Sequence, residues 1–320
     1  MPSLMLLLAL MFLLVPPSQA TEYHFRTVEV SFANTHDSIV TGLNDTGVSV
    51  GRYFQVGQLI NGFRLQRPRG RFEPLPRLEP VAITNTDIII GRVGTPERGF
   101  FLQDGTFTTW QVREPSPDYP FFTLASTTPV ASNDRSITVG EYFSILDSQV
   151  HNFLYDPSTG EFVLFAFPGT PRAFLTGINN ADQFTAVAFD PVLPPRSFLG
   201  DRTRQDLTPA NLPDFPDGEL IGLTDDGILA GNVGSVGFLV KDGVGQVIEV
   251  PGALSTDLQG IRNDLTVYGA YQSADFRSHG FIATPDGTRI VPRPDSAARL
   301  RPFTLADCGP GSKRLVCRAP

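Results

Sequence analysis

The chain has 320 residues, a formal net charge of −8 and only two cysteines, and 41% of its residues are hydrophobic. This length permits one large domain or two, with a substantial buried core. The acidic balance argues against a nucleic-acid partner, because phosphate recognition requires clustered cations.

The first twenty residues have the features of a secretory leader. They carry no charge, and an apolar stretch over residues 4–15 is followed by two prolines and by Ser18-Gln19-Ala20, a small-x-small cleavage pattern. Twelve apolar residues are fewer than the roughly 20 that span a bilayer. No Lys or Arg precedes the stretch, so a retained anchor is the alternative. We predict a signal peptide at 1–20, and a secreted or periplasmic protein without a membrane span after cleavage.

A ten-residue unit recurs six times along the rest of the chain. Each copy opens with a small residue, carries Asp or Asn at its fourth position, and is followed by a phenylalanine 16 to 22 residues after its start. The copies are 42–51, 82–91, 131–140, 177–186, 222–231 and 260–269, with Asp45, Asn85, Asp134, Asn180, Asp225 and Asn263 in fourth position, and Phe63, Phe100, Phe153, Phe198, Phe238 and Phe281 behind them. Recurrence of this kind indicates a repeat architecture.

Each unit has the pattern of a turn followed by a strand. Asp or Asn tolerates left-handed backbone geometry or caps its own turn, and Gly47 and Gly227 supply a positive φ two residues later. β-branched residues follow, as in Ile88 to Ile90. The phenylalanine then opens another strand, often followed by a tight turn such as Asp242-Gly243 and a further strand. The pattern predicts four short strands per repeat.

The distance between unit starts predicts the architecture. It is 40, 49, 46, 45 and 38 residues, close to the roughly 40 to 50 of propeller blades. We therefore predict an all-β protein, a β-propeller of six blades with four antiparallel strands each, over residues 21–293. A strand at 26–32 would complete the last blade and close the ring. Residues 290–292 compete for the same position, so five or seven blades remain alternatives.

The phenylalanine-bearing elements resemble a known family. His279-Gly280-Phe281 and, more loosely, His151-Asn152-Phe153 are similar to the His-small-Phe signature of HAF-repeat proteins, which are bacterial and extracellular. Their Gly-Ile-Asn-like turn is matched by residues 177–180 and 260–263, whereas four copies lack the histidine. The resemblance covers nearly the whole mature chain. It implies a secreted, propeller-like protein and brings no established activity.

The last segment, residues 294–320, is expected to be a tail outside the propeller. Cys308 and Cys317 flank the turn-forming sequence Gly309-Pro310-Gly311. Two cysteines that bracket a turn in an exported protein predict a local disulfide that holds the tail.

No motif in the chain predicts a reaction. His151 and His279 occupy equivalent repeat positions, which favours a structural role, and no zinc-binding spacing occurs. The densest acidic segment, from Asp214 to Asp226, could bind calcium through oxygen ligands, but it lacks the EF-hand spacing. We therefore expect no cofactor.

The connections between strands indicate where a ligand would bind. The regular Asp/Asn turns should share one face of a propeller, and the connections of variable length should share the other: 114–120, 144–150, 190–195, 212–218 and 272–278. Variable length is typical of a binding surface, although weakly constrained loops vary too. The candidate ligand-binding residues are Tyr119, Asp147, Asp214, Asp217, Asp275 and Arg277.

We expect a monomeric, non-enzymatic binding or surface-interaction propeller whose partner is an extracellular protein or glycan. The alternative is an extracellular hydrolase or lyase that acts on polysaccharide. In that case Asp214 and Asp217, near the central funnel, would be the paired acids.

Overall fold

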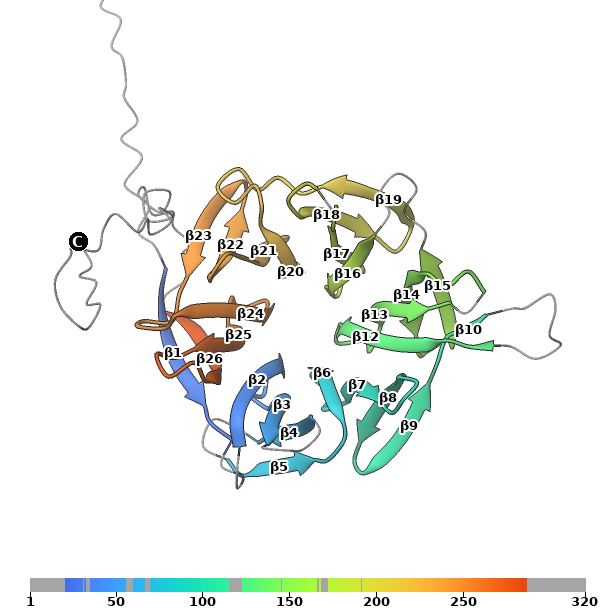
Figure 1. The fold of residues 1–320 in the computed structure, drawn as a ribbon, viewed down its shortest axis with the longest axis horizontal. Coiled ribbons are helices and arrows are strands. Elements are labelled where there is room, and N and C mark those ends of the chain that lie inside the picture. The colour runs from blue at the N-terminus through green and yellow to red at the C-terminus, as the bar shows by residue number, and fades with distance from the viewer. Residues whose placement is uncertain are drawn as a thin grey trace, which may run out of the picture.

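The computed structural model describes residues 21–30, 32, 35–55, 60–66, 70–114, 123–144, 146–165, 167, 172–190 and 192–286. This part of the chain forms 26 strands and no helix, and therefore no helix that could cross a membrane. Six four-stranded antiparallel sheets stand around a central axis (Figure 1). The predicted six-bladed propeller is confirmed.

Each blade uses four strands, ordered from the axis outward. Blade 1 contains β2 (Thr35–Leu43), β3 (Ser49–Gln55), β4 (Asn61–Leu65) and β5 (Phe72–Leu75). Blade 2 contains β6 (Glu79–Ile83), β7 (Ile89–Val93), β8 (Arg98–Gln103) and β9 (Thr106–Trp110). Blade 3 contains β12 (Ser126–Ser132), β13 (Thr138–Phe143), β14 (Val150–Asp156) and β15 (Glu161–Phe165). Between blades 2 and 3, β10 (Arg113–Glu114) pairs with β11 (Thr123–Leu124).

The second half of the ring repeats this order. Blade 4 contains β16 (Ala173–Ile178), β17 (Gln183–Ala188), β18 (Arg196–Asp201) and β19 (Arg204–Pro209). Blade 5 contains β20 (Glu219–Leu223), β21 (Leu229–Val233), β22 (Val236–Lys241) and β23 (Val244–Ile248). Blade 6 contains β24 (Ser255–Ile261), β25 (Val267–Gln272), β26 (Ser278–Asp286) and, outermost, β1 (Glu22–Val28).

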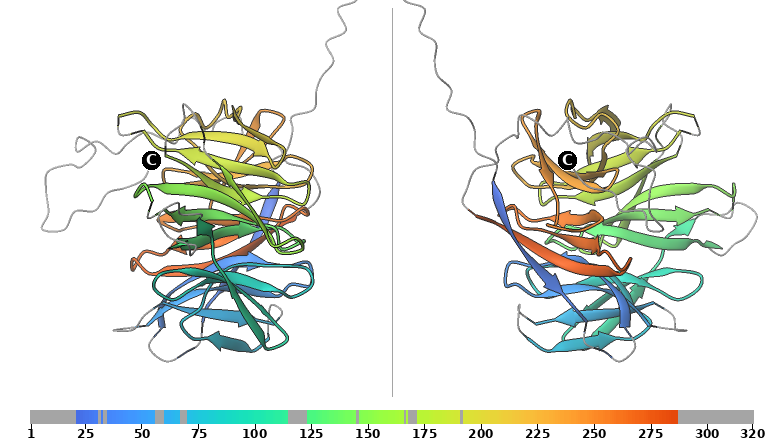
Figure 2. Two further views of the ribbon diagram at one scale, coloured as in Figure 1. Left: turned by 90° about the vertical axis from the view of Figure 1, so that its right-hand side faces the viewer. Right: turned by 60° about the vertical axis from the view of Figure 1, so that its left-hand side comes forward.

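The first strand of the chain closes the ring. β1 pairs antiparallel with β26 in a continuous register from Glu22 opposite Asp286 to Val28 opposite Gly280, and Figure 2 shows the two strands side by side. The predicted closure by the N-terminal strand is confirmed, although the strand covers 22–28 and not 26–32. The competing residues 290–292 lie outside the described part of the chain.

Antiparallel pairing places the connections alternately on two faces. Turns between first and second strands, and between third and fourth strands, lie on one side, which we call the turn face. Links between second and third strands, and links from one blade to the next, lie on the other side, which we call the loop face. The separation of regular turns from variable connections therefore follows from the observed strand order.

The core of each blade is built around one phenylalanine. In most blades the glycine that closes the repeat unit lies directly opposite the following phenylalanine, as with Gly140 and Phe153. A Cβ added at Gly140 would lie 2.8 Å from Cζ of Phe153 and 2.2 Å from the carbonyl oxygen of Thr128. The missing side chain thus makes room for the ring, which is fully buried.

Blade 4 solves the same packing problem differently. Its unit closes with Ala186, and the residue opposite Phe184 is Gly200. A Cβ at Gly200 would lie 2.4 Å from the Phe184 ring. Phe184 is therefore the fully buried aromatic side chain of this blade, whereas Phe198, which follows the unit in sequence, stays 6% exposed.

Candidate functional site

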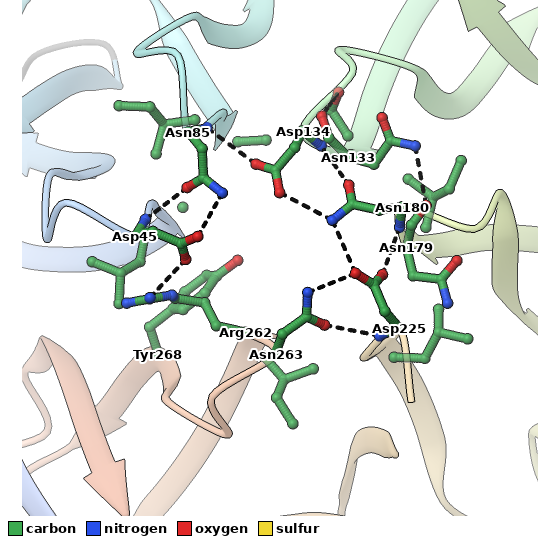
Figure 3. A pocket seen from close by; sticks show the side chains of 18 residues that line it. Asp45, Asn85, Asn133, Asp134, Asn179, Asn180, Asp225, Arg262, Asn263 and Tyr268 are labelled. Carbon is green, nitrogen blue, oxygen red and sulfur yellow. Dashed lines mark hydrogen bonds and ion pairs between the residues drawn. The ribbon is translucent and has the colours of Figure 1, made fainter. Parts of the chain in front are cut away.

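The fourth-position residues of the six units form a ring around the axis on the turn face (Figure 3). Aspartate and asparagine alternate around the ring. In five of the six steps a backbone N–H donates to the side-chain oxygen of the next member, at 2.7–3.0 Å. The members in order are Asp45, Asn85, Asp134, Asn180, Asp225 and Asn263.

An arginine makes the link between the last blade and the first. Nη2 of Arg262 donates to Oδ1 of Asp45 at 2.7 Å and lies 3.3 Å from Oδ2 of Asp264. A charge-assisted hydrogen bond therefore connects blade 6 with blade 1 at the axis, on the opposite edge of blade 6 from β1.

The third residue of the unit, and not the fourth, holds the turn. Oδ1 of Asn133 accepts from the N–H groups of Arg135 and Ile137, while Nδ2 donates to the carbonyl oxygen of Asn179 in the next blade. Positive φ values occur two residues after the fourth position, as at Asp182 (60°). The fourth-position side chain, which the sequence pattern assigned to its own turn, bonds the neighbouring blade instead.

The ring surrounds a polar hollow of about 100 Å³. The hydroxyl of Tyr268 projects into it (Figure 3). Burial raises the pKa of Tyr268 to about 12, with Arg262 and Asp134 as smaller and opposing influences. Three carboxylates and one guanidinium line the hollow. Within the described part of the chain, no three His, Cys, Asp or Glu side chains are grouped to hold a metal ion.

The predicted ligand-binding residues that the structure describes lie in three connections of the loop face: β13–β14, β19–β20 and β25–β26. Asp147, between β13 and β14, lies 2.8 Å from Nε2 of His151. Asp275, between β25 and β26, accepts from the Ser273 hydroxyl at 2.5 Å and pairs with Arg277 at 3.5 Å. The Ser273 hydrogen bond is the largest of the influences that lower the pKa of Asp275.

Two more of these residues lie between β19 and β20. Oδ2 of Asp214 accepts from the N–H of Gly245 at 2.8 Å, which fastens this connection to β23. Asp217 is exposed. No hydrogen bond or ion pair among the described residues joins these two to Asp147 or Asp275. Tyr119, Cys308 and Cys317 lie outside the described residues, so the candidate ligand contact and the disulfide remain predictions.

Exposed apolar side chains gather on the loop face, which the sequence did not predict. Eight of the eleven exposed large hydrophobic residues in the described part of the chain lie there, whereas Phe107, Leu164 and Val244 lie elsewhere. A loop sequence does not reveal which apolar residue is exposed, so only the variable length of the connections pointed to this face. The eight are Phe143, Leu146, Val150, Phe189, Val192, Leu193, Leu254 and Phe276.

The most exposed of these side chains lie in two loops with defined backbone geometry. Oδ1 of Asp190 accepts from the N–H groups of Val192 (2.8 Å) and Leu193 (3.1 Å), which are 87% and 55% exposed. Those backbone hydrogen bonds lower the pKa of Asp190. Phe276 is 74% exposed at the tip of its turn, with φ at +63°. Left-handed backbone is unfavourable for a bulky side chain, so this residue is not the one that turn geometry alone would select.

A network of charges lies toward the loop-face end of the axis. Oε2 of Glu79 accepts from Arg92 at 2.8 Å and from Arg52 at 3.4 Å. Burial is the largest influence that lowers the pKa of Arg52, and burial raises the pKa of Glu141. The network joins blades 1 and 2 and leaves the Glu141 carboxyl in a poorly solvated position.

Comparison with known proteins supports the fold alone. The chain matches no protein-family model and no curated protein. Similar solved structures include the β-propeller domain of the trilobed protease from Pyrococcus furiosus, with 8% identity over 79% of this chain and 96% of that one, and a TM-score of 0.48. An oligogalacturonate lyase in complex with manganese has 10% identity over 84% and 98%, with a TM-score of 0.47. The Aleuria aurantia lectin in complex with Fucα1-6GlcNAc has 9% identity over 81% and 98%, with a TM-score of 0.46.

Proposed function

We propose that this protein is a secreted, non-enzymatic binding propeller that takes a protein partner on its loop face. The concentration of exposed apolar side chains on that face carries the proposal. Apolar groups that gather on one exposed face of a protein mark interaction sites. The most exposed of them, Val192, Phe276 and Leu193, offer hydrophobic contact without hydrogen-bonding groups, which suits a protein surface better than a glycan.

The geometry of blade 4 supports the same function. The Asp190 hydrogen bonds fix the backbone of Val192 and Leu193 before any partner arrives. A preorganised loop loses less conformational entropy on binding, so more of the contact energy is retained as affinity. Residues of this kind are expected to act as anchors of an interface.

The hydrogen bond of Asp214 to Gly245 favours a binding function over polysaccharide hydrolysis. Hydrolysis by a carboxyl pair requires both groups to face the substrate from opposite sides of the scissile bond. One oxygen of Asp214 is already engaged by the N–H of Gly245. This contact gives the residue a structural role in holding the connection before β20.

The test compares paired variants on the two faces. The protein is immobilised and probed with the secreted proteins of its source organism, and the captured partner is purified and titrated. We expect the double variant Val192→Asp, Leu193→Asp to lower the affinity roughly 5- to 30-fold, which is about 1–2 kcal/mol for the pair. Val244→Asp, an exposed valine outside the loop face, should leave the affinity unchanged.

Two results would contradict the proposal. Equal loss of affinity in the loop-face double variant and the Val244 variant would show that the loop face is not the binding surface. Turnover of an extracellular polysaccharide that Asp214→Ala abolishes would establish the hydrolase or lyase instead.

A further inference from the structure

A buried carboxamide holds the residue that directly precedes the ring-closing strand. Gln246, in the outermost strand of blade 5, is 5% exposed, and its Nε2 donates to the carbonyl oxygen of Thr21 at 2.7 Å. Side chains alternate between the two faces of a strand, so Gln246 shares a face of β23 with Ile248. Ile248 belongs to the core cluster that blades 5 and 6 share with the first aromatic residues of β1. The carboxamide therefore lies at the seam where the start of β1 meets blade 5.

The hydrogen bonding of this contact is incomplete. Oε1 of Gln246 and Oγ1 of Thr21 are both buried, and neither has a hydrogen-bond partner among the residues that the structure describes. The two atoms belong to residues that already bind each other, so both unsatisfied groups lie at one contact. A buried acceptor without a donor is unfavourable and rare in native proteins. Because a carboxamide oxygen only accepts, the group that satisfies Oε1 is a donor close to Thr21.

Processing of the predicted leader creates such a donor. Ser18-Gln19-Ala20 predicts cleavage directly before Thr21. Hydrolysis of the Ala20–Thr21 peptide bond by water leaves a carboxylate on Ala20 and turns the amide nitrogen of Thr21 into an ammonium group. An ammonium carries three N–H donors and a positive charge, and its hydrogen bonds are stronger than those of an amide. The new group belongs to the residue whose carbonyl oxygen Gln246 already binds.

We propose that Gln246 forms a binding site for this chain's own α-ammonium group, which leader cleavage creates on Thr21. Oε1 of the carboxamide accepts from the ammonium while Nε2 keeps the Thr21 carbonyl, so one side chain binds both ends of the first residue. Cleavage thereby completes the seam between blades 5 and 6 and strengthens the closure of the ring. The inference rests on the secreted character in the proposed function and is independent of binding at the loop face.

The test moves the ammonium group without changing the propeller. Two glycines are inserted between Ala20 and Thr21 of the full-length precursor, and both proteins are purified after export. N-terminal sequencing should give Thr21 as the first residue of the natural protein and glycine as that of the insertion variant. We expect the natural protein to unfold at a temperature roughly 2–4 °C higher, because only its ammonium group reaches Gln246.

Two glutamine variants separate the hydrogen bond from crowding by the added glycines. Gln246→Met removes the carboxamide at similar size, and in this background the insertion should shift the unfolding temperature by less than about 1 °C. Gln149→Met, at an exposed glutamine, should preserve the full difference. If the insertion costs the same with methionine at position 246, the glycines act through crowding and the proposal is overturned.

The reactivity of the α-amine gives a second measurement that needs no change at Gln246. An acetylating reagent at pH 8 modifies free α-amines and exposed lysines, and the exposed Lys241 is the internal reference. We expect the α-amine of the natural protein to react at least fivefold more slowly, relative to Lys241, than that of the insertion variant. Equal rates would overturn the proposal, because a bound ammonium group is protected.

The outcomes also distinguish this inference from the proposed function. Cleavage before Thr21 without a difference in stability or reactivity refutes the ammonium site alone. An exported protein that begins at another residue refutes it as well. A chain that is neither exported nor cleaved refutes both this inference and the secreted character of the protein. Loop-face binding is tested separately by the valine variants.

Discussion

At the residue scale, the recurring glycine and phenylalanine of the repeat act as one packing unit. The side chain is absent at Gly140 because the Phe153 ring occupies that space in the neighbouring strand. Protein cores are close-packed, so a single added methyl group in such a position is felt.

Gly140→Ala should destabilise the propeller by about 1–3 kcal/mol through overpacking. Gly222→Ala is the matched control, because a Cβ there would meet only Ile261 Cγ2 at 3.8 Å. Denaturant unfolding midpoints measure both effects. Equal loss in the two variants would mean that lost backbone freedom, and not the contact with the ring, decides the cost.

A second prediction at the residue scale concerns acid stability. Asp156 is buried, and its pKa is lowered chiefly by the Ser158 hydroxyl, with help from Arg202 of the next blade at 2.8 Å. A carboxyl whose folded pKa lies below its unfolded value stabilises the fold above that unfolded value, about 3.9. The contribution is lost as the pH falls through the folded pKa.

Asp156→Asn should therefore lower the unfolding free energy at neutral pH and flatten its decline below about pH 4. Asp104→Asn, in an exposed turn, is the control and should preserve the decline. The measurement is the urea midpoint between pH 2 and pH 7. A decline of unchanged steepness in the Asp156 variant would assign acid sensitivity to other carboxyls.

At the element scale, the turn between the first and second strands of a blade is held by the third residue of the ten-residue unit. Asn133 is buried, accepts two backbone N–H groups of its own turn and donates to the carbonyl oxygen of Asn179. Thr84 and Thr224 keep part of this pattern, since their hydroxyls accept from the N–H of Ile88 and Ile228. Five of the six blades have asparagine or threonine at this position, and blade 6 has Arg262.

Asn133→Ala should cost about 2–4 kcal/mol, because one buried and one partly buried N–H group lose their acceptor and the bond to the next blade disappears. Asn133→Thr should recover part of the loss, since threonine occupies this position in blades 2 and 5. Thermal unfolding of the three proteins gives the comparison. If threonine is no better than alanine, the bond to Asn179 is the important one.

Strand existence was easier to predict than strand bounds. The repeat spacing, the turn residues and the β-branched stretches indicated four strands in each blade. These signals are visible in short stretches of sequence. The first strand was placed four residues too late, and the short β10–β11 pair was not foreseen. The end of a strand depends on its register with a neighbouring strand. The neighbour of β1 is β26, at the other end of the chain: His24 pairs with Thr284, 260 residues away.

At the scale of the whole molecule, several contacts hold blade 6 to blade 1, among them the hydrogen bond from the N–H of Gly280 to the hydroxyl of Ser38. β1 pairs with β26 on the outside of blade 6, and Arg262 binds Asp45 at the axis. The outer contact is the larger, since Val28 and its neighbours add buried apolar area.

Removal of residues 21–28 should leave β26 as an unpaired edge and lower the unfolding temperature by several degrees. A synthetic peptide of residues 21–30, added in excess, should restore the unfolding temperature by pairing with β26 as an added strand. The same peptide with Val28→Asp should fail, because it places a charge at a site that is 2% exposed. Unchanged stability without β1 would show that the axial contacts close the ring unaided.

Sequence reasoning identified a candidate surface but not the contacts of its residues, and binding at that surface stays a prediction. Variable connection lengths pointed to the loop face, and Asp147, Asp214, Asp217, Asp275 and Arg277 lie there. Their partners were not predictable, because the Asp214 contact with Gly245 joins segments that are 31 residues apart. The exposure of Val192 and Leu193 depends in the same way on how blade 4 faces solvent.

The sequence by itself determined the architecture, since the repeat period, the turn residues and the strand pattern are local properties that recur six times. Only the tertiary structure decided what the recurring residues do. Closing the ring brought five of the six fourth-position residues into hydrogen-bond contact with the next blade, and it buried Phe184 more completely than Phe198 in the core of blade 4. It also gathered exposed apolar side chains on one face. Contacts between blades arise from the position of whole sheets, which no short stretch of sequence encodes.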